Sequence, residues 1–212
     1  MQFICEVKKA SPSKGLIAEY FPYLEIAKAY EAAGAAAISV LTETDYFLGD
    51  DRYLKQIAET VRTPLLRKDF TVDAYQIYQA KNLGAGAVLL ICAILDEQTI
   101  RSFIEICDHL GMSALVEAHD REEVRMACHA GARIIGVNNR NLKDFTVDIR
   151  NSLRLREMVS KDILFVAESG ISTPEDVRAL REGGVNGVLI GESLMRAKDK
   201  KARLDYLRGK QS

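Results

Sequence analysis

Short runs of apolar, strand-forming residues alternate along the chain with amphipathic stretches of helical periodicity. A helix-like segment follows each of eight strand candidates, at residues 3–7, 36–41, 64–67, 87–91, 113–117, 133–137, 163–167 and 187–190. No Pro/Gly/Ser-rich linker or charge block divides the chain, so residues 1–212 are expected to form a single domain. Eight strand–helix units in roughly 200 to 250 residues predict an α/β fold of the (β/α)8 TIM barrel type.

Two further features favour the barrel over a doubly wound open sheet. Most strand candidates are continuous apolar runs, as expected when helices cover one face of a parallel sheet and side chains fill the other. A glycine that ends a helix and leads into the next strand recurs about every 50 residues, at Gly34, Gly84, Gly131 and Gly184. The open sheet is the alternative, but no G-x-G-x-x-G phosphate cradle follows the first strand.

Composition and charge exclude several classes of protein. With 29 Lys+Arg and 30 Asp+Glu, the net charge of −1 creates no global attraction to nucleic acid or to an anionic membrane. The longest nearly apolar run, residues 85–95, is too short to span a bilayer. The four cysteines lack redox or zinc spacing, and the three histidines lack the i, i+4 spacing of a helical metal pair. We therefore expect a cytoplasmic protein without a bound metal and without nucleic-acid or membrane partners.

Charged side chains stand at the predicted carboxyl ends of alternate strands. Glu6 and Lys8 close the first strand, whereas Lys68, Glu117 and Glu168 end the third, fifth and seventh. Side chains from alternate strands form one layer of a barrel interior, so these groups are expected to meet at its mouth. Strand-end charges that reach for solvent or for one another are the alternative. Lysines among carboxylates in a partly desolvated mouth favour proton-transfer chemistry, for which no metal is needed.

Glycine-containing loops after the last two predicted strands indicate a phosphate site. Ser169 and Gly170 follow the seventh strand, and Gly191 and Glu192 lead from the eighth into a short helix. Barrels commonly hold phosphate at these loops and at a helix N-terminus, and glycine lets backbone N–H groups approach the anion closely. Ser11, in the loop after the first strand, could close over the same anion. Two ordinary glycine turns are the alternative.

Polar and aromatic residues elsewhere at the predicted mouth suit an organic substrate. Asn138, directly after the sixth strand, can orient a hydroxyl, and Arg140 can hold a carboxylate in fork geometry. Phe47 and Phe70 lie in loops after the second and third strands, where they could form an apolar wall. A plain turn for the asparagine-rich loop and ordinary packing for the aromatic rings are the alternatives.

Seven motifs, in order, resemble the indole-3-glycerol phosphate synthase family of tryptophan biosynthesis. They are EVKKASPS at 6–13, SVLT at 39–42, RKDF at 67–70, LVE at 115–117, GVNNRNL at 136–142, AESGI at 167–171 and LIGESLM at 189–195. The match runs from Cys5 to about Arg196. The resemblance implies an enzyme of the carbon–carbon lyase class, a carboxy-lyase, with a small phosphorylated substrate and no cofactor.

The resemblance also implies roles for the charged residues. The substrate would be 1-(2-carboxyphenylamino)-1-deoxyribulose 5-phosphate, which closes a ring, loses CO₂ and then water, and gives indole glycerol phosphate. Lys68 would be the general acid that polarises the ketone, with Glu117 beside it. Lys8 and Glu6 would assist proton transfer and dehydration.

The remaining residues would bind the substrate. Asn138 and Glu168 would hold its hydroxyls and anilino nitrogen, with Arg140 and Ser11 near its carboxylate and phosphate ends. The phosphate group is expected at Gly170, Gly191 and Glu192, with Ser169 close by. The anthranilate ring is expected between Phe47, Phe70 and Leu90.

Two other functions stay open at this point. Family members usually carry a helical segment before the first strand, which we expect this chain to lack, so a ligand-binding relative with weak or no turnover is possible. A phosphoribosylanthranilate isomerase would need a Cys/Asp acid–base pair at strand ends, but Cys5 precedes the polar end and Glu117 is not an aspartate. We expect a monomer or a weak homo-oligomer.

Overall fold

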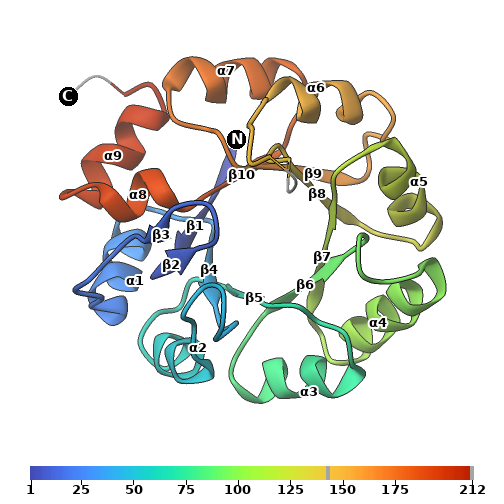
Figure 1. The fold of residues 1–212 in the computed structure, drawn as a ribbon, viewed down its shortest axis with the longest axis horizontal. Helices are drawn as coiled ribbons and strands as arrows, with labels where there is room; N and C mark the ends of the chain where they lie inside the picture. Colours follow the sequence, from blue (N-terminus) through green and yellow to red (C-terminus); the bar gives the residue numbers. More distant parts are fainter. Residues whose placement is uncertain (142–143, 211–212) are drawn as a thin grey trace.

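Eight parallel strands close into a barrel in the computed structural model, which describes residues 1–141 and 144–210 (Figure 1). The strands are β1 (Gln2–Val7), β4 (Ala37–Leu41), β5 (Leu65–Lys68), β6 (Ala87–Ile91), β7 (Ser113–Ala118), β8 (Ile134–Asn138), β9 (Leu164–Glu168) and β10 (Gly187–Ile190). The first strand, β1, pairs in parallel with both β10 and β4, which closes the sheet. The predicted (β/α)8 barrel is therefore confirmed.

Helices form an outer ring around these strands (Figure 1). In the described chain they are α1 (Tyr23–Ala32), α2 (Asp51–Ala58), α3 (Ala74–Asn82), α4 (Glu97–His109), α5 (Arg121–His129), α6 (Arg150–Arg156), α7 (Pro174–Glu182), α8 (Glu192–Arg196) and α9 (Lys200–Leu207). The short helix expected after the last strand is α8. No helix of the described residues is long and apolar enough to cross a membrane.

Polar residues and glycines set the helix boundaries. Asp120 caps α5, and Thr173 forms a capping box with Asp176 at the start of α7. Thr71 is also of a residue type that caps helices, but α3 is capped by Asp73, which accepts the N–H of Tyr75. The repeated glycines that follow α1, α3, α5 and α7 all have positive φ, which glycine adopts without steric cost: Gly34, Gly84, Gly131 and Gly184.

Apolar side chains form two separate layers, one on each face of the barrel wall. The larger lies between the strands and the helices. The smaller fills the barrel and consists of Leu66, Leu89, Ile91, Leu115, Val166 and Leu189. Side chains two residues apart on a strand share a face, so Lys68 points the same way as Leu66, and Glu117 the same way as Leu115. The apolar floor of the barrel thus leads directly to charged groups at its mouth.

Four strands, β5, β7, β8 and β9, run one residue further at the carboxyl end than the sequence predicts, and in three of them the added residue is polar. β5 includes Lys68, β8 includes Asn138 and β9 includes Glu168. The cause is that the ladder continues to these positions, where Leu41 is in register with Lys68, and Asn138 with Glu168. These polar groups therefore project from rigid strands rather than from loops. A small hairpin of β2 (Ala10–Ser11) and β3 (Gly15–Leu16), not predicted, follows β1.

Candidate active site

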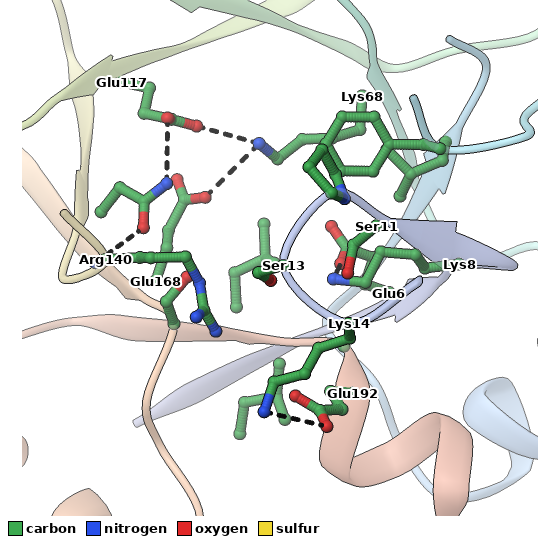
Figure 2. Close-up of a pocket in the computed structure, with 18 of the residues that line it drawn as sticks. Glu6, Lys8, Ser11, Ser13, Lys14, Lys68, Glu117, Arg140, Glu168 and Glu192 are labelled. Carbon is green, nitrogen blue, oxygen red and sulfur yellow. Dashed lines mark hydrogen bonds and ion pairs between the residues drawn. The ribbon is translucent and has the colours of Figure 1, made fainter. Parts of the chain in front are cut away.

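A cavity of about 900 Å³ opens at the carboxyl ends of the strands (Figure 2). Most of the predicted site residues line it: Glu6, Lys8, Ser11, Phe47, Lys68, Phe70, Glu117, Asn138, Arg140, Glu168, Ser169, Gly170, Gly191 and Glu192. They come from strand ends and loops spread along the whole barrel, and closure of the sheet brings them together. Leu142, the last residue of the 136–142 motif, lies outside the described residues.

Lys68 lies at the centre of the charged groups, with two carboxylates beside it. Its Nζ is 2.9 Å from Oε2 of Glu117 and 3.6 Å from Oε2 of Glu168 (Figure 2). Asn138 donates from Nδ2 to the other oxygen of Glu117, Oε1, at 3.2 Å. Both carboxylates are almost fully buried, so they hold the ammonium in one place and face it with little competing water.

The charges of this group shift its pKa values in different directions. Burial opposes the charge of Lys68, but Glu117, Glu168 and Glu6 outweigh burial and raise its pKa far above the ordinary range. Burial also opposes the charge of Glu117, but Lys68 outweighs it and lowers the pKa of this carboxyl. Burial dominates at Glu168 and, with the nearby charge of Glu117, raises its pKa. Without substrate, Lys68 is therefore an ammonium, Glu117 stays an ionised carboxylate, and Glu168 is the carboxyl that takes up a proton readily.

One oxygen of Glu168 packs against the neighbouring strand β8. Its Oε1 is buried and has no hydrogen-bond partner among the described residues. A side chain at position 136 would collide with this oxygen, so Gly136 of β8 provides the space for the carboxylate. A buried polar atom without a partner is costly, so a hydrogen-bond donor that reached this oxygen would stabilise the carboxylate.

A second ion pair occupies the β1 side of the cavity. Lys8 Nζ is 2.6 Å from Oε1 of Glu6, and Ser39 donates from Oγ to Oε2 of Glu6 at 3.5 Å. A side chain at position 191 would collide with this pair, so Gly191 keeps space for it. The cavity therefore contains two lysine–carboxylate pairs, as the alternate-strand pattern predicts.

The loops after β9 and β10 provide backbone N–H groups and nearby cations. Ser169 and Gly170 both have positive φ, at 66° and 78°, and two successive residues of this kind turn the chain sharply. Lys14 extends from the β2–β3 hairpin to within 3.7 Å of Oε1 of Glu192 (Figure 2). The arrangement has the glycines and positive charge that a phosphate group needs. Lys14 is an addition to the predicted site residues, although its loop was predicted to close over an anion.

The β8 strand end is fixed by its own asparagines. Asn138 accepts the N–H of Arg140 at 3.1 Å, and Arg140 donates from Nη1 to the carbonyl of Phe145 at 3.2 Å. The buried Asn139 accepts both the N–H and the hydroxyl of Ser152, and donates from Nδ2 to the carbonyl of Ser169. Asn139 thus connects β8, α6 and the loop after β9, a function that its sequence position did not reveal.

The apolar side of the cavity differs from the prediction at one residue. Phe47 and Phe70 lie with ring centroids 6.4 Å apart and line the cavity as expected. Leu90 does not, because it faces the helices and belongs to the outer apolar layer. Its neighbours on β6, Leu89 and Ile91, point inward and line the cavity in its place.

The wall of the cavity is shaped by a carboxylate that the sequence did not single out. Glu43 accepts the backbone N–H groups of Asp45, Tyr46 and Phe47 at 2.7–2.9 Å, and so folds the loop after β4 that carries the Phe47 ring. Its position directly after the SVLT motif is the only signal in the sequence.

Two other kinds of site find no support in the described residues. No group of three or more His, Cys, Asp or Glu side chains there is arranged to hold a metal ion. Cys5 belongs to the outer apolar layer, where burial raises the pKa of its thiol to about 12. It therefore does not face the cavity as the acid or base of an isomerase would.

Comparison with known proteins adds evidence from sequence and from fold. The family model for indole-3-glycerol phosphate synthase matches residues 1–207. The indole-3-glycerol phosphate synthase of Ruminiclostridium cellulolyticum is 64% identical over 99% of this chain and 80% of that protein. That of Lachnoclostridium phytofermentans is 60% identical over 98% of this chain and 77% of that protein.

Similar solved structures have different activities and support the fold alone. The 3-hexulose-6-phosphate synthase of Salmonella typhimurium has a TM-score of 0.79 at 17% identity, covering 99% of this chain and 97% of that one. Thiamine phosphate pyrophosphorylase from Pyrococcus furiosus has a TM-score of 0.73 at 19% identity, covering 98% and 94%. The barrel is thus shared with enzymes that act on other substrates.

Proposed function

Because the chain belongs to the indole-3-glycerol phosphate synthase family, we propose that its cavity converts 1-(2-carboxyphenylamino)-1-deoxyribulose 5-phosphate to indole glycerol phosphate. The activity is that of a carbon–carbon lyase, a carboxy-lyase, in tryptophan biosynthesis. The observation that carries the assignment of roles is the partly buried ammonium of Lys68, held between Glu117 and Glu168. It places a proton donor and two carboxylates at one point of the cavity.

Lys68 acts in ring closure. The ring carbon that carries the carboxylate bonds to the ketone carbon, while Lys68 gives a proton to the ketone oxygen. Loss of CO₂ then returns its electron pair to the ring and restores aromaticity. Glu117 orients the ammonium, but its negative charge also opposes the release of a proton from Lys68. Substrate binding therefore has to draw Lys68 toward the ketone.

Lys8 and Glu6 act in dehydration. The new hydroxyl leaves as water with a proton, and the methylene carbon beside nitrogen loses a proton to complete the indole ring. The pair at 2.6 Å on the β1 side of the cavity offers an acid and a base for these two transfers. Glu168 and Asn138 hold the hydroxyls and the anilino nitrogen, which suits the unpartnered oxygen of Glu168.

The two ends of the substrate occupy opposite parts of the cavity. Its phosphate binds at Gly170, Gly191 and Glu192 with Ser169 and Ser11 nearby, and its carboxylate lies near Arg140. Phe47 and Phe70, with Leu89 and Ile91, enclose the aromatic ring. Binding both anionic ends fixes the reacting carbons next to Lys68, which is the main contribution that a site can make to ring closure.

The oligomeric state, the cellular location and the need for a cofactor are proposed from the same site. All proposed groups come from one chain, which supports a monomer or a weak homo-oligomer, with residues 1–212 as one catalytic domain. The four cysteines are free thiols, which supports a cytoplasmic location. The proposed steps need the small phosphorylated substrate and use no cofactor.

A steady-state assay of indole fluorescence with this substrate tests the proposal. We expect the Lys68→Ala variant to lose about 10²–10⁴-fold in kcat, because the ketone oxygen loses its proton donor. Lys161→Ala is the matched control, since Lys161 is exposed in the connection that precedes β9, at the opposite end of the barrel. Full turnover by a folded Lys68→Ala variant, or no turnover by the parent chain, would contradict the proposal.

A further inference from the structure

His119 lies beside the catalytic carboxylate but behind the cavity wall. It follows β7 two residues after Glu117, and its Nε2 is 3.4 Å from Oε1 of Glu117. This nitrogen is buried and has no hydrogen-bond partner within the described chain. The ring is outside the cavity lining formed by the described residues. Its direct contact with the groups of the cavity is therefore the one with Glu117.

Glu123 holds the opposite edge of the ring. Nδ1 of His119 is 3.0 Å from Oε2 of Glu123, and the same oxygen accepts the backbone N–H of His119 at 2.7 Å. Glu123 is itself in the first turn of α5, where Asp120 accepts its N–H. Asn151 of α6 donates to the carbonyl of His119 at 3.1 Å. The imidazole is thus fixed by neighbouring elements before any substrate binds.

The two carboxylates favour the doubly protonated ring. A neutral imidazole has one N–H, so one of its nitrogens would direct a lone pair at a carboxylate. An imidazolium has an N–H on each side and suits both. Burial opposes its charge, but Glu117 and Glu123 outweigh burial and raise the pKa of His119 to about 10. The other titratable groups around this cluster are Lys68 of β5, Glu168 of β9, Cys92 after β6 and Asp120.

We propose that His119 is a positioning residue, whose imidazolium, held by Glu123, fixes Oε1 of Glu117 and so leaves Oε2 to orient Lys68. This inference rests on the proposed function of Lys68. It makes His119 the support of the central ion pair from outside the cavity, where it faces the same carboxylate oxygen as Asn138 does from inside. Without it, Glu117 has one fewer positive group and can rotate away from the ammonium.

Two substitutions separate the contact with Glu117 from the contact with Glu123. The amide nitrogen of asparagine occupies about the place of Nδ1, so His119→Asn keeps the contact with Glu123 alone. The amide nitrogen of glutamine extends to about the place of Nε2, so His119→Gln can still donate to Glu117. We expect kcat to fall about tenfold in His119→Asn and to recover in part in His119→Gln. KM should stay unchanged, because the ring does not line the cavity.

His129→Asn is the matched control. His129 ends α5 and faces Glu97 at 3.6 Å, but its side chain is 70% exposed and far from the cavity mouth. This variant should keep the parent kcat and KM. Equal losses of kcat in His119→Asn and His119→Gln, matched by equal losses of thermal stability, would overturn the proposal in favour of a purely structural role.

The titration of Glu117 gives a readout that a structural role would not change. Loss of the imidazolium removes a positive neighbour from Glu117 and so raises the pKa of this carboxyl. In ¹³C NMR, the carboxyl signal of Glu117 should therefore begin to shift at higher pH in His119→Asn than in the parent chain, and less so in His119→Gln. A Glu117 signal that titrates identically in His119→Asn and the parent chain would overturn the proposal.

A titration by NMR distinguishes this inference from the assignment of activity. The ring signals of His119, identified by their loss in His119→Asn, should remain those of an imidazolium at about pH 8, above the unperturbed histidine pKa of about 6.5. A parent chain without turnover but with this imidazolium would contradict the proposed function, but it would not contradict the contact by which His119 positions Glu117. A ring that is neutral at that pH would overturn the inference, whether or not the chain is active.

Discussion

Glu168 is a buried acid whose ionisation works against folding. Burial raises the pKa of this carboxyl above the ordinary value of 4.5, so the folded chain holds the proton at pH values where the unfolded chain has released it. The contribution of Glu168 to stability is fully present at pH values below the ordinary pKa, and it is lost as pH rises through the raised pKa of the folded chain. Function at this position therefore costs stability at neutral and alkaline pH.

A glutamine at position 168 should remove this pH dependence. Glu168→Gln resembles the protonated acid, so we expect the two proteins to be similarly stable at acidic pH. As pH rises, the variant should become the more stable by about 1 kcal/mol or more. Urea unfolding of both proteins over a pH series measures the difference, in which the contributions of Glu117 and Lys68 largely cancel. A difference that does not change with pH would refute this explanation.

Single residues also show how far sequence reasoning extends. The charges at positions 6, 68, 117 and 168 could be placed together because the side-chain period of a strand is fixed at two and the barrel orders its layers. Asn139 and His119 could not be assigned in this way. Their importance depends on contacts with α6 and α5, and a sequence does not specify which helix face lies opposite a strand end.

At the scale of whole elements, Asn139 and Asn186 offer a test of how the two ends of the barrel differ. Asn139 joins β8, α6 and the loop after β9 at the cavity end. Asn186 accepts the N–H of Phe165 at 2.8 Å at the opposite end of β9. Both asparagines therefore satisfy backbone groups between elements, but only Asn139 supports a loop of the cavity.

We expect Asn139→Ala and Asn186→Ala each to lower the free energy of unfolding by about 1–3 kcal/mol, since each leaves partners without a hydrogen bond. Only Asn139→Ala should raise KM, by about threefold or more, because the loop that carries Ser169 loses its support. Chemical unfolding and steady-state kinetics measure the two effects. An equal rise of KM in both variants would show that general loosening, and not the loop, determines binding.

The eight barrel strands and the presence of a helix after each were predictable from sequence, but the orientation of one strand was not. Residues 87–91 are apolar throughout, since helices cover one face of β6 and the barrel interior the other. Alternation of polar and apolar residues is therefore absent, and nothing in the residue types shows that Leu89 rather than Leu90 faces inward. Where Lys68 and Glu117 interrupt their strands, the polar residue itself reveals the face.

For the molecule as a whole, Arg208 links the last helix to the first strand–helix unit. It donates from Nη1 to the carbonyl of Ala33 and from Nη2 to that of Gly34, both at 2.7 Å, just after α1. Its guanidinium also lies over the ring of Phe3, at 5.3 Å from the centroid. Parts of the chain that are far apart in sequence are thus joined at the end of the barrel away from the cavity.

Removal of this link should affect stability and leave catalysis intact. We expect Arg208→Ala to lower the free energy of unfolding by about 2–4 kcal/mol, because two charge-assisted hydrogen bonds and a cation–π contact are lost. Under conditions where the variant is folded, kcat and KM should equal those of the parent. Arg178→Ala, at an exposed position of α7, is the control for thermal and urea unfolding. A large change of kcat in folded Arg208→Ala would contradict this separation.

The pairing of β1 with β10 also has a consequence for biosynthesis. Residues 8–186 separate β1 from β10 in the chain, so one row of backbone N–H and C=O groups on β1 waits for a partner until β10 emerges from the ribosome. An open row of this kind is a template for strands of other nascent chains. The interval of greatest aggregation risk is therefore set by the time needed to translate the residues between these two strands, and cellular chaperones would have to shield β1 throughout it.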